Sequence, residues 1–171
     1  MEFYELYDKY GNNLHKVVNH DYALSNNEYR AIAHLVIFNE KKEMLIQKRG
    51  IYKKDFPNVF DISCGGGVNE GESAYQAAKR ELKEELGISL DFDDRAYFRV
   101  FYPKGIDDYF IAIVNKDDIN PIIDYKEVLA FRWASEKEIV KMMKKKQFVS
   151  YNKGFIELLF AMINNRGTYL L

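Results

Sequence analysis

The chain has 171 residues, and 47% of them are hydrophobic, which suits one domain with a sizeable core. Its net charge of -1 excludes the strong basic field of proteins that bind nucleic acids or anionic membranes. The sequence has one cysteine, Cys64, no visible secretory leader and no run of about 18 apolar residues. We therefore expect a soluble, cytoplasmic protein that forms a single domain over residues 1–171.

The first half of the chain is rich in patterns that predict β-strands. Ala31–Phe38 is an almost unbroken apolar run, as in a strand covered on both faces. A basic loop, Arg49–Val59, interrupts the strands. The five strands expected here are Phe3–Tyr7, Leu14–Val18, Ala31–Phe38, Met44–Lys48 and Phe60–Cys64.

The second half mixes helices with further strands. Ser135 and Glu138 have capping-box spacing and predict a helix start, and another helix is expected within Phe155–Asn164. The three strands expected here are Tyr97–Tyr102, Tyr109–Val114 and Val128–Trp133. Because strands and helices do not alternate regularly, the order favours an α+β fold with a mixed sheet over a doubly wound fold.

One helix is predicted with both of its ends. Ser73 is a candidate N-cap with Gln76 at capping-box spacing, and Gly87 is placed to form a left-handed C-cap, so the helix should span Ala74–Leu86. Before it, Gly65–Gly67 leave the backbone bare and free to adopt dihedrals closed to other residues, and we expect a loop that can bring backbone carbonyls or amides close to a ligand.

Three carboxylates share one face of this helix. Glu81, Glu84 and Glu85 are related by i, i+3 and i, i+4 spacing, next to the apolar stripe that contains Leu82 and Leu86. Like charges at this spacing repel, and their position near the helix C-terminus adds to the cost. A bound cation would offset it. Oxygen donors without His or Cys indicate Mg²⁺ or Mn²⁺ rather than Zn²⁺.

Glutamate-rich helices are usually solvent-facing, but here the surrounding spacing is specific. Residues 66–88 read glycine, five residues, Glu, seven residues, Arg-Glu, an aliphatic residue, any residue, Glu-Glu, any residue, Gly and an aliphatic residue. This resembles the signature of the Nudix hydrolase family. The nine specified positions are filled by Gly66, Glu72, Arg80, Glu81, Leu82, Glu84, Glu85, Gly87 and Ile88.

The resemblance implies a Nudix-type α/β/α sandwich and a metal-dependent hydrolase that cleaves a diphosphate linkage in a nucleoside diphosphate derivative or a similar small molecule. It implies that Glu81, Glu84, Glu85 and the carbonyl of Gly66 hold Mg²⁺ or Mn²⁺, and that Glu81 or Glu85 acts as the base. Arg80 would orient a carboxylate and Glu72 would support the loop before the helix. A homodimer would be unsurprising for the family.

Residues outside this signature have open alternatives. Arg49, Lys53 and Lys54 could bind substrate phosphates or could form an ordinary solvated basic loop. The further acids are Asp107, Asp108 and Glu127, which could be ordinary surface residues. We expect one of these acids to reach the metal site.

The flanking sequence also resembles the family branch that contains isopentenyl-diphosphate isomerase. That enzyme needs a Cys and two His residues at positions that fall here on Gly65, Gly67 and Arg30. Cys64 is one residue off and is expected to be a buried hydrophobe, and His34 a packed core residue. Three hypotheses follow: a Nudix hydrolase, which we favour, an isomerase of this type, and a non-catalytic Nudix domain that senses a nucleotide.

Overall fold

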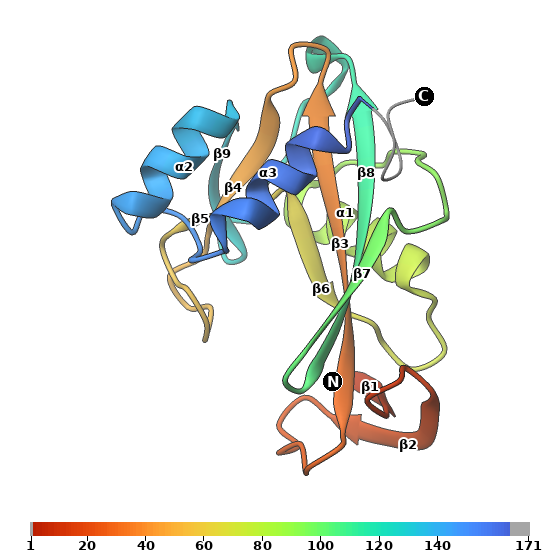
Figure 1. Ribbon diagram of the computed structural model, residues 1–171. Helices are drawn as coiled ribbons and strands as arrows, with labels where there is room; N and C mark the ends of the chain where they lie inside the picture. Colours follow the sequence, from red (N-terminus) through yellow and green to blue (C-terminus); the bar gives the residue numbers. More distant parts are fainter. Residues whose placement is uncertain (1, 165–171) are drawn as a thin grey trace.

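A computed structural model describes residues 2–164 (Figure 1). Nine strands lie in this part of the chain: β1 (Phe3–Tyr7), β2 (Asn13–Asn19), β3 (Tyr29–Asn39), β4 (Met44–Arg49), β5 (Phe60–Asp61), β6 (Cys64–Gly67), β7 (Phe98–Tyr102), β8 (Gly105–Val114) and β9 (Val128–Ala134). The helices described are α1 (Ala74–Leu86), a 3-10 turn η1 (Lys116–Asp118), α2 (Glu136–Lys144) and α3 (Lys153–Ala161).

Strand β3 organises the sheet because it pairs with four others. It runs parallel to β8 over its whole paired length, from Arg30 opposite Gly105 to Asn39 opposite Val114. It is antiparallel to β1, β4 and β6. Away from β3, strand β4 pairs with β5 and β9, and strand β8 pairs with β7. The mixed sheet and α+β class expected from the sequence are therefore confirmed.

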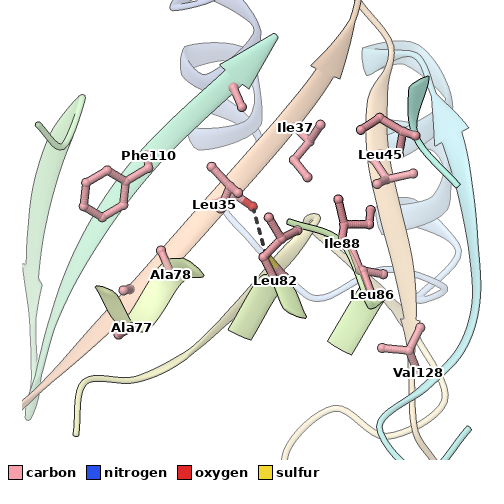
Figure 2. Packing of buried hydrophobic residues seen from close by; sticks show 14 of the residues in the cluster. Leu35, Ile37, Leu45, Ala77, Ala78, Leu82, Leu86, Ile88, Phe110 and Val128 are labelled. Atoms are coloured by element: carbon pink, nitrogen blue, oxygen red, sulfur yellow. Dashed lines mark hydrogen bonds between the residues drawn. The ribbon is translucent and has the colours of Figure 1, made fainter. Parts of the chain in front are cut away.

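The two faces of the sheet bury different helices, and β3 contributes to both (Figure 1). Leu35 and Ile37 point to one side, where they pack with Leu82 and Leu86 of α1 (Figure 2). Val36 and Phe38 point to the other side, where they pack with residues of α2 and α3. Side chains alternate along a strand, so this one apolar run supplies both cores. The result is the helix–sheet–helix sandwich that the sequence indicated.

Local signals set the ends of α1. The Ser73 hydroxyl accepts from the Gln76 N–H at 3.2 Å, and the Gln76 side chain accepts from the Ser73 N–H at 2.8 Å, which completes the capping box. Gly87 has φ 66°, the left-handed conformation that ends helices, and its N–H donates to the Lys83 carbonyl. Both ends agree with the boundaries predicted from the sequence.

The glycine-rich segment differs from the expectation. Phe60–Cys64 is not one strand: β5 ends at Asp61, and β6 begins at Cys64 and includes Gly65–Gly67. These three glycines are therefore not a loop but lie on β6, paired with β3. None of the three has a positive φ, so close neighbours rather than unusual dihedrals explain the absence of side chains.

Two further elements start earlier than expected from the sequence, each for its own reason. β8 starts at Gly105 rather than Tyr109, so Asp107 and Asp108 lie within the strand and not before it. Helix α3 starts at Lys153, two residues before the expected segment, because the Asn152 side chain caps it.

In residues 2–164 no helix is long and apolar enough to cross a membrane.

The capping box of α1 can be tested by removing its hydroxyl. We expect Ser73→Ala to destabilise the protein by about 1 kcal/mol, since the first turn of the helix loses a hydrogen-bond acceptor. This corresponds to a fall in Tm of about 2–4 °C in thermal unfolding. Ser150→Ala, at an exposed serine outside the helices, is the control. Equal melting temperatures for the two variants would contradict this role of the cap.

Candidate active site

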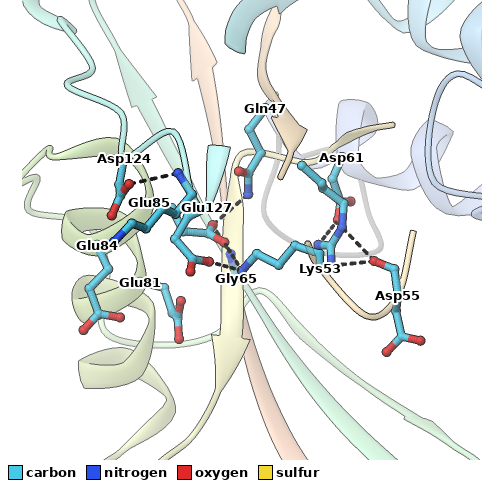
Figure 3. A network of polar contacts seen from close by, with 12 residues as sticks. Gln47, Lys53, Asp55, Asp61, Gly65, Glu81, Glu84, Glu85, Asp124 and Glu127 are labelled. Carbon is cyan, nitrogen blue, oxygen red and sulfur yellow. Dashed lines mark hydrogen bonds and ion pairs between the residues drawn. The ribbon is translucent and has the colours of Figure 1, made fainter. Parts of the chain in front are cut away.

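A cavity of about 440 Å³ lies where α1 meets β6. Its acidic wall combines helix residues with residues from the segment before β9: Glu81, Glu84, Glu85, Asp124 and Glu127. Gly65–Gly67 of β6 and Lys53 from the loop after β4 also line it. Glu81, Glu84 and Glu85, three of the four glutamates of the signature, therefore open onto one cavity, and among the further acids Asp107, Asp108 and Glu127 it is Glu127 that lies with them (Figure 3).

Arg80 holds the helix carboxylates and the preceding loop together. Its Nε and Nη2 donate to the two oxygens of Glu72 at 2.9 and 3.0 Å, and Nη2 also donates to the Gly67 carbonyl at 2.8 Å. Its Nη1 donates to Glu81 at 2.6 Å and to Glu84 at 3.2 Å. A planar guanidinium can satisfy this many acceptors at fixed angles, which an ammonium group cannot do.

Glu85 is the most deeply buried acid of the site, with 2% of its surface exposed. Its Oε2 accepts from the Gln47 side-chain amide at 2.7 Å and from the Gly65 N–H at 3.3 Å. Burial raises the pKa of Glu85 to about 7, against the opposing effect of the Lys53 charge. Burial likewise raises the pKa of Glu81, although Arg80 opposes the change. Glu85 therefore retains some affinity for a proton near neutral pH.

Lys53 places a positive charge among these acids. Its Nζ lies 3.6 Å from Glu85 Oε1 and forms an ion pair with Glu127 (Figure 3). Burial would lower the pKa of Lys53, but the hydrogen bond to Glu127 and the nearby negative charges raise it. Lys53 and His20 are the only residues able to carry positive charge among the described residues that line the cavity.

The glycines of β6 make room for functional side chains. A Cβ on Gly66 would lie 2.1 Å from Glu81 Oε1, and a Cβ on Gly65 would lie 2.4 Å from His34 Nδ1. Only a residue without a side chain lets the Glu81 carboxylate rest against this strand. Position 66 is therefore restricted by a close approach and not by backbone dihedrals.

The other candidate residues lie outside this cavity or are already engaged. Arg49 donates to the carbonyls of Asp55 and Phe56 and to the Asp61 carboxylate, so it braces the loop that carries Lys53. Lys54 is exposed on that loop.

The two acids of β8 point to opposite faces of the sheet. Asp108 forms a bidentate pair with Arg99, with both distances 2.7 Å. Asp107 lies on the other face, 3.3 Å from His34 Nε2 and 3.2 Å from the Tyr109 hydroxyl. His34 is half-buried and packed, as expected: its ring stacks on that of Tyr109 with centroids 4.7 Å apart, and it also contacts the Asp107 carboxylate.

Several residues of the site were not found from the sequence. Gln47 could have been found, because it is a lone amide in the apolar segment MLIQK. In the structure its side chain donates to Glu85. Asp124, Glu2, Tyr4 and His20 had none, since only the fold brings them to the cavity.

The donors of this cavity fit a hard divalent cation in their chemistry. They are carboxylate oxygens with no thiolate among them, the set that Mg²⁺ and Mn²⁺ prefer. The ammonium of Lys53 occupies a cation position beside Glu85 and Glu127. Within residues 2–164 no three acidic, His or Cys side chains converge closely enough to hold a metal as they stand, because Arg80 holds Glu81 and Glu84. To hold a metal together with Glu85, the Glu81 and Glu84 side chains would have to turn away from Arg80, and Arg80 would keep its hydrogen bonds to Glu72.

Comparison with known proteins identifies the family. The NUDIX domain profile matches residues 28–159, which is most of the chain. The chain belongs to the Nudix hydrolase family. An uncharacterized Nudix hydrolase of Listeria innocua is 34% identical to it over 142 residues, covering 82% of this chain and 83% of that protein. Isopentenyl-diphosphate Delta-isomerase 1 of Mus musculus is 30% identical over 130 residues, covering 64% of this chain and 56% of that enzyme.

Solved structures agree on the fold of this Nudix hydrolase. The Deinococcus radiodurans protein DR0079 superposes with a TM-score of 0.74 at 20% identity, covering 94% of this chain and 98% of that one. A MutT protein from Methanosarcina mazei Go1 gives a TM-score of 0.64 at 26% identity, covering 80% of this chain and 96% of that one. Nudix hydrolases generally use divalent metal ions and act on small molecules.

The burial of Glu85 predicts a pH-dependent gain from its removal. Because the folded protein raises this pKa from 4.5 to about 7, the folded state binds more protons than the unfolded state in that window, and stability falls as pH rises through it. In chelator, Glu85→Gln should match wild type near pH 5. At pH 8 it should be more stable by up to about 3 kcal/mol.

Thermal unfolding at the two pH values measures this difference. Glu70→Gln, at an exposed acid of the loop before α1, serves as the control and should show no such pH-dependent gain. A Glu85→Gln variant that is less stable than wild type at pH 8 would contradict the desolvation argument.

Proposed function

We propose that this Nudix hydrolase is a metal-dependent pyrophosphohydrolase that cleaves the diphosphate linkage of a nucleoside diphosphate derivative or similar small molecule. One observation carries the metal dependence. The described lining of the cavity has six acids against Lys53 and His20, so an anionic diphosphate could enter only with added positive charge. Mg²⁺ or Mn²⁺ held by Glu81, Glu84, Glu85 and the Gly66 carbonyl would supply that charge, with Glu127 or Asp124 as a further ligand.

The chain's own residues account for the remaining steps. When bound, the metal would neutralise charge on the phosphate oxygens and make water easier to deprotonate. A water molecule attacks one phosphorus, Glu81 or Glu85 accepts its proton, and the other phosphate leaves with the bridging oxygen as the P–O bond breaks; the raised pKa values of the two carboxylates are consistent with this role. Arg80 and Glu72 keep α1 positioned against β6. Lys53, once its carboxylate partners bind metal, contacts a substrate phosphate.

The chain is proposed to act as one Nudix domain that includes residues 1–27, ahead of the segment matched by the family profile. Its single cysteine, Cys64, is buried and free, which suits the reducing cytoplasm. We therefore propose the cytoplasm as its compartment and small-molecule diphosphates as its partners.

Metal dependence is the direct test. On a panel of nucleotides, nucleotide sugars and dinucleotides, activity should disappear in excess chelator and return with Mg²⁺ or Mn²⁺, read as released phosphate or monophosphate. The same metals should raise Tm, since they bind the folded site preferentially. Full turnover in chelator would rule out the proposed mechanism.

Individual carboxylates can then be neutralised without changing their size. Glu85→Gln and Glu84→Gln should each lower kcat, and we expect the loss for buried Glu85 to be about 10²-fold or more. Lys83→Gln, on an exposed position of the same helix, should change kcat little. If both glutamine variants kept wild-type kcat, the ligand roles assigned to them would be wrong.

The isomerase hypothesis is not favoured by the cavity or by Cys64. The thiol is 1% exposed, packs in the core under α1 and has its pKa raised by burial. We expect no conversion of isopentenyl diphosphate with Mg²⁺ and Mn²⁺ together, and Cys64→Ala should leave phosphate release nearly unchanged. Isomerisation that disappears in Cys64→Ala would place the enzyme in the other class.

A further inference from the structure

Part of the catalytic cavity is built by residues ahead of the family-matched segment, which begins at residue 28. Glu2, Tyr4 and His20 line the same cavity as Glu81 and Glu85. They belong to the N-terminal hairpin, which we define as residues 2–20 with strands β1 and β2. The hairpin therefore faces any molecule that the helix carboxylates can reach.

The hairpin is fixed directly to the loop before the catalytic helix. Tyr4 pairs with Asn69 as an isolated β-bridge, and the Glu70 N–H donates to the Phe3 carbonyl at 2.8 Å. The Tyr4 ring lies against Gly67, where a Cβ would come within 2.3 Å of it. These contacts hold the hairpin at a defined position relative to α1.

Two aromatic rings of the hairpin, those of Tyr4 and His20, lie at the cavity. Tyr4 and His20 have ring centroids 6.3 Å apart at an interplanar angle of 53°. Arg30 stacks its guanidinium 5.2 Å from the Tyr4 ring and donates to the His20 carbonyl at 3.0 Å, so it holds both residues. Tyr4 is buried, whereas 59% of the His20 side chain is exposed beside the cavity. The His20 imidazole therefore has exposed surface on which a ligand ring can stack.

The chemistry of the lining limits what the hairpin could recognise. The described lining contains no aliphatic side chain, so a prenyl chain would find no apolar surface to cover it. The Tyr4 and His20 rings are the aromatic surface available in that lining, and the Glu2 carboxylate beside the Tyr4 hydroxyl is an acceptor for N–H groups. A planar, polar heterocycle matches this combination, because every such ring has a π-face and edge donors.

We propose that the N-terminal hairpin is the specificity element of this enzyme, in which His20, held by Tyr4 and Arg30, forms a stacking subsite for a planar heterocycle on the far side of the scissile diphosphate. This inference rests on the proposed function, since the subsite and the carboxylates share one cavity. His20 supplies the contact that a substrate can gain or lose, and Tyr4 and Arg30 position it.

Binding can be measured without turnover. The chain has three histidines, so their imidazole protons can be followed individually by NMR. On titration with AMP, GMP, CMP or UMP in the presence of Mg²⁺, the His20 ring protons should shift through the ring current of the base, and those of exposed His15 should not. Ribose 5-phosphate, which lacks a base, should leave His20 in place. The subsite is absent if no nucleotide shifts His20, or if ribose 5-phosphate shifts it equally.

Kinetics with matched substrates give the second measurement. With Mg²⁺, we compare nucleotide diphosphates with base-free diphosphates such as ribose 5-diphosphate. His20→Ala should raise KM about five- to tenfold for the base-containing substrates alone, with kcat little changed. His20→Phe, which keeps a ring, should restore most of the loss, and His15→Ala is the control.

The outcomes separate the two proposals. If wild-type protein cleaves no diphosphate of either set, the proposed function fails. If it cleaves diphosphates but prefers the base-free set, or if His20→Ala leaves KM for base-containing substrates unchanged, the hydrolase stands and the hairpin subsite is wrong.

Discussion

The five-fold hydrogen bonding of Arg80 is the interaction on which the site depends. One guanidinium joins the loop before α1 through Glu72, strand β6 through the Gly67 carbonyl, and the carboxylate face of α1 through Glu81 and Glu84. The apolar stripe next to this face buries α1 against the sheet, so packing holds the helix in place and Arg80 ties its carboxylates to the loop and to β6.

Features specified by neighbouring residues could be predicted from the sequence. The ends of α1 agree with prediction because Ser73, Gln76 and Gly87 act within one turn of the helix. The apolar run of β3 was recognisable because a strand buried on both faces has no polar alternation. The convergence of Glu81, Glu84 and Glu85 on one cavity follows from helical periodicity alone.

Features specified by long-range pairing could not be predicted in this way. The strand was expected to begin at Tyr109, yet parallel pairing with β3 extends it back to Gly105, and Arg99 satisfies the charge of Asp108 within it. The glycines of β6 suggested a loop with unusual dihedrals, but they lie on a strand beside a carboxylate, an imidazole and a phenol ring from other segments. The hairpin residues Tyr4 and His20 reach the cavity only because β1 pairs with the end of β3, which no local pattern encodes.

Gly50 links two segments that border the cavity, the loop with Lys53 and the segment with Glu127. Its N–H donates to the Glu127 carbonyl at 2.8 Å, and a Cβ there would lie 2.4 Å from the Lys126 carbonyl oxygen. The loop that carries Lys53 and the segment that carries Glu127 are thus joined through their backbones as well as by the ion pair of these two side chains. An opening of this side of the cavity that keeps this backbone hydrogen bond moves both segments together, and with them Lys53 and Glu127.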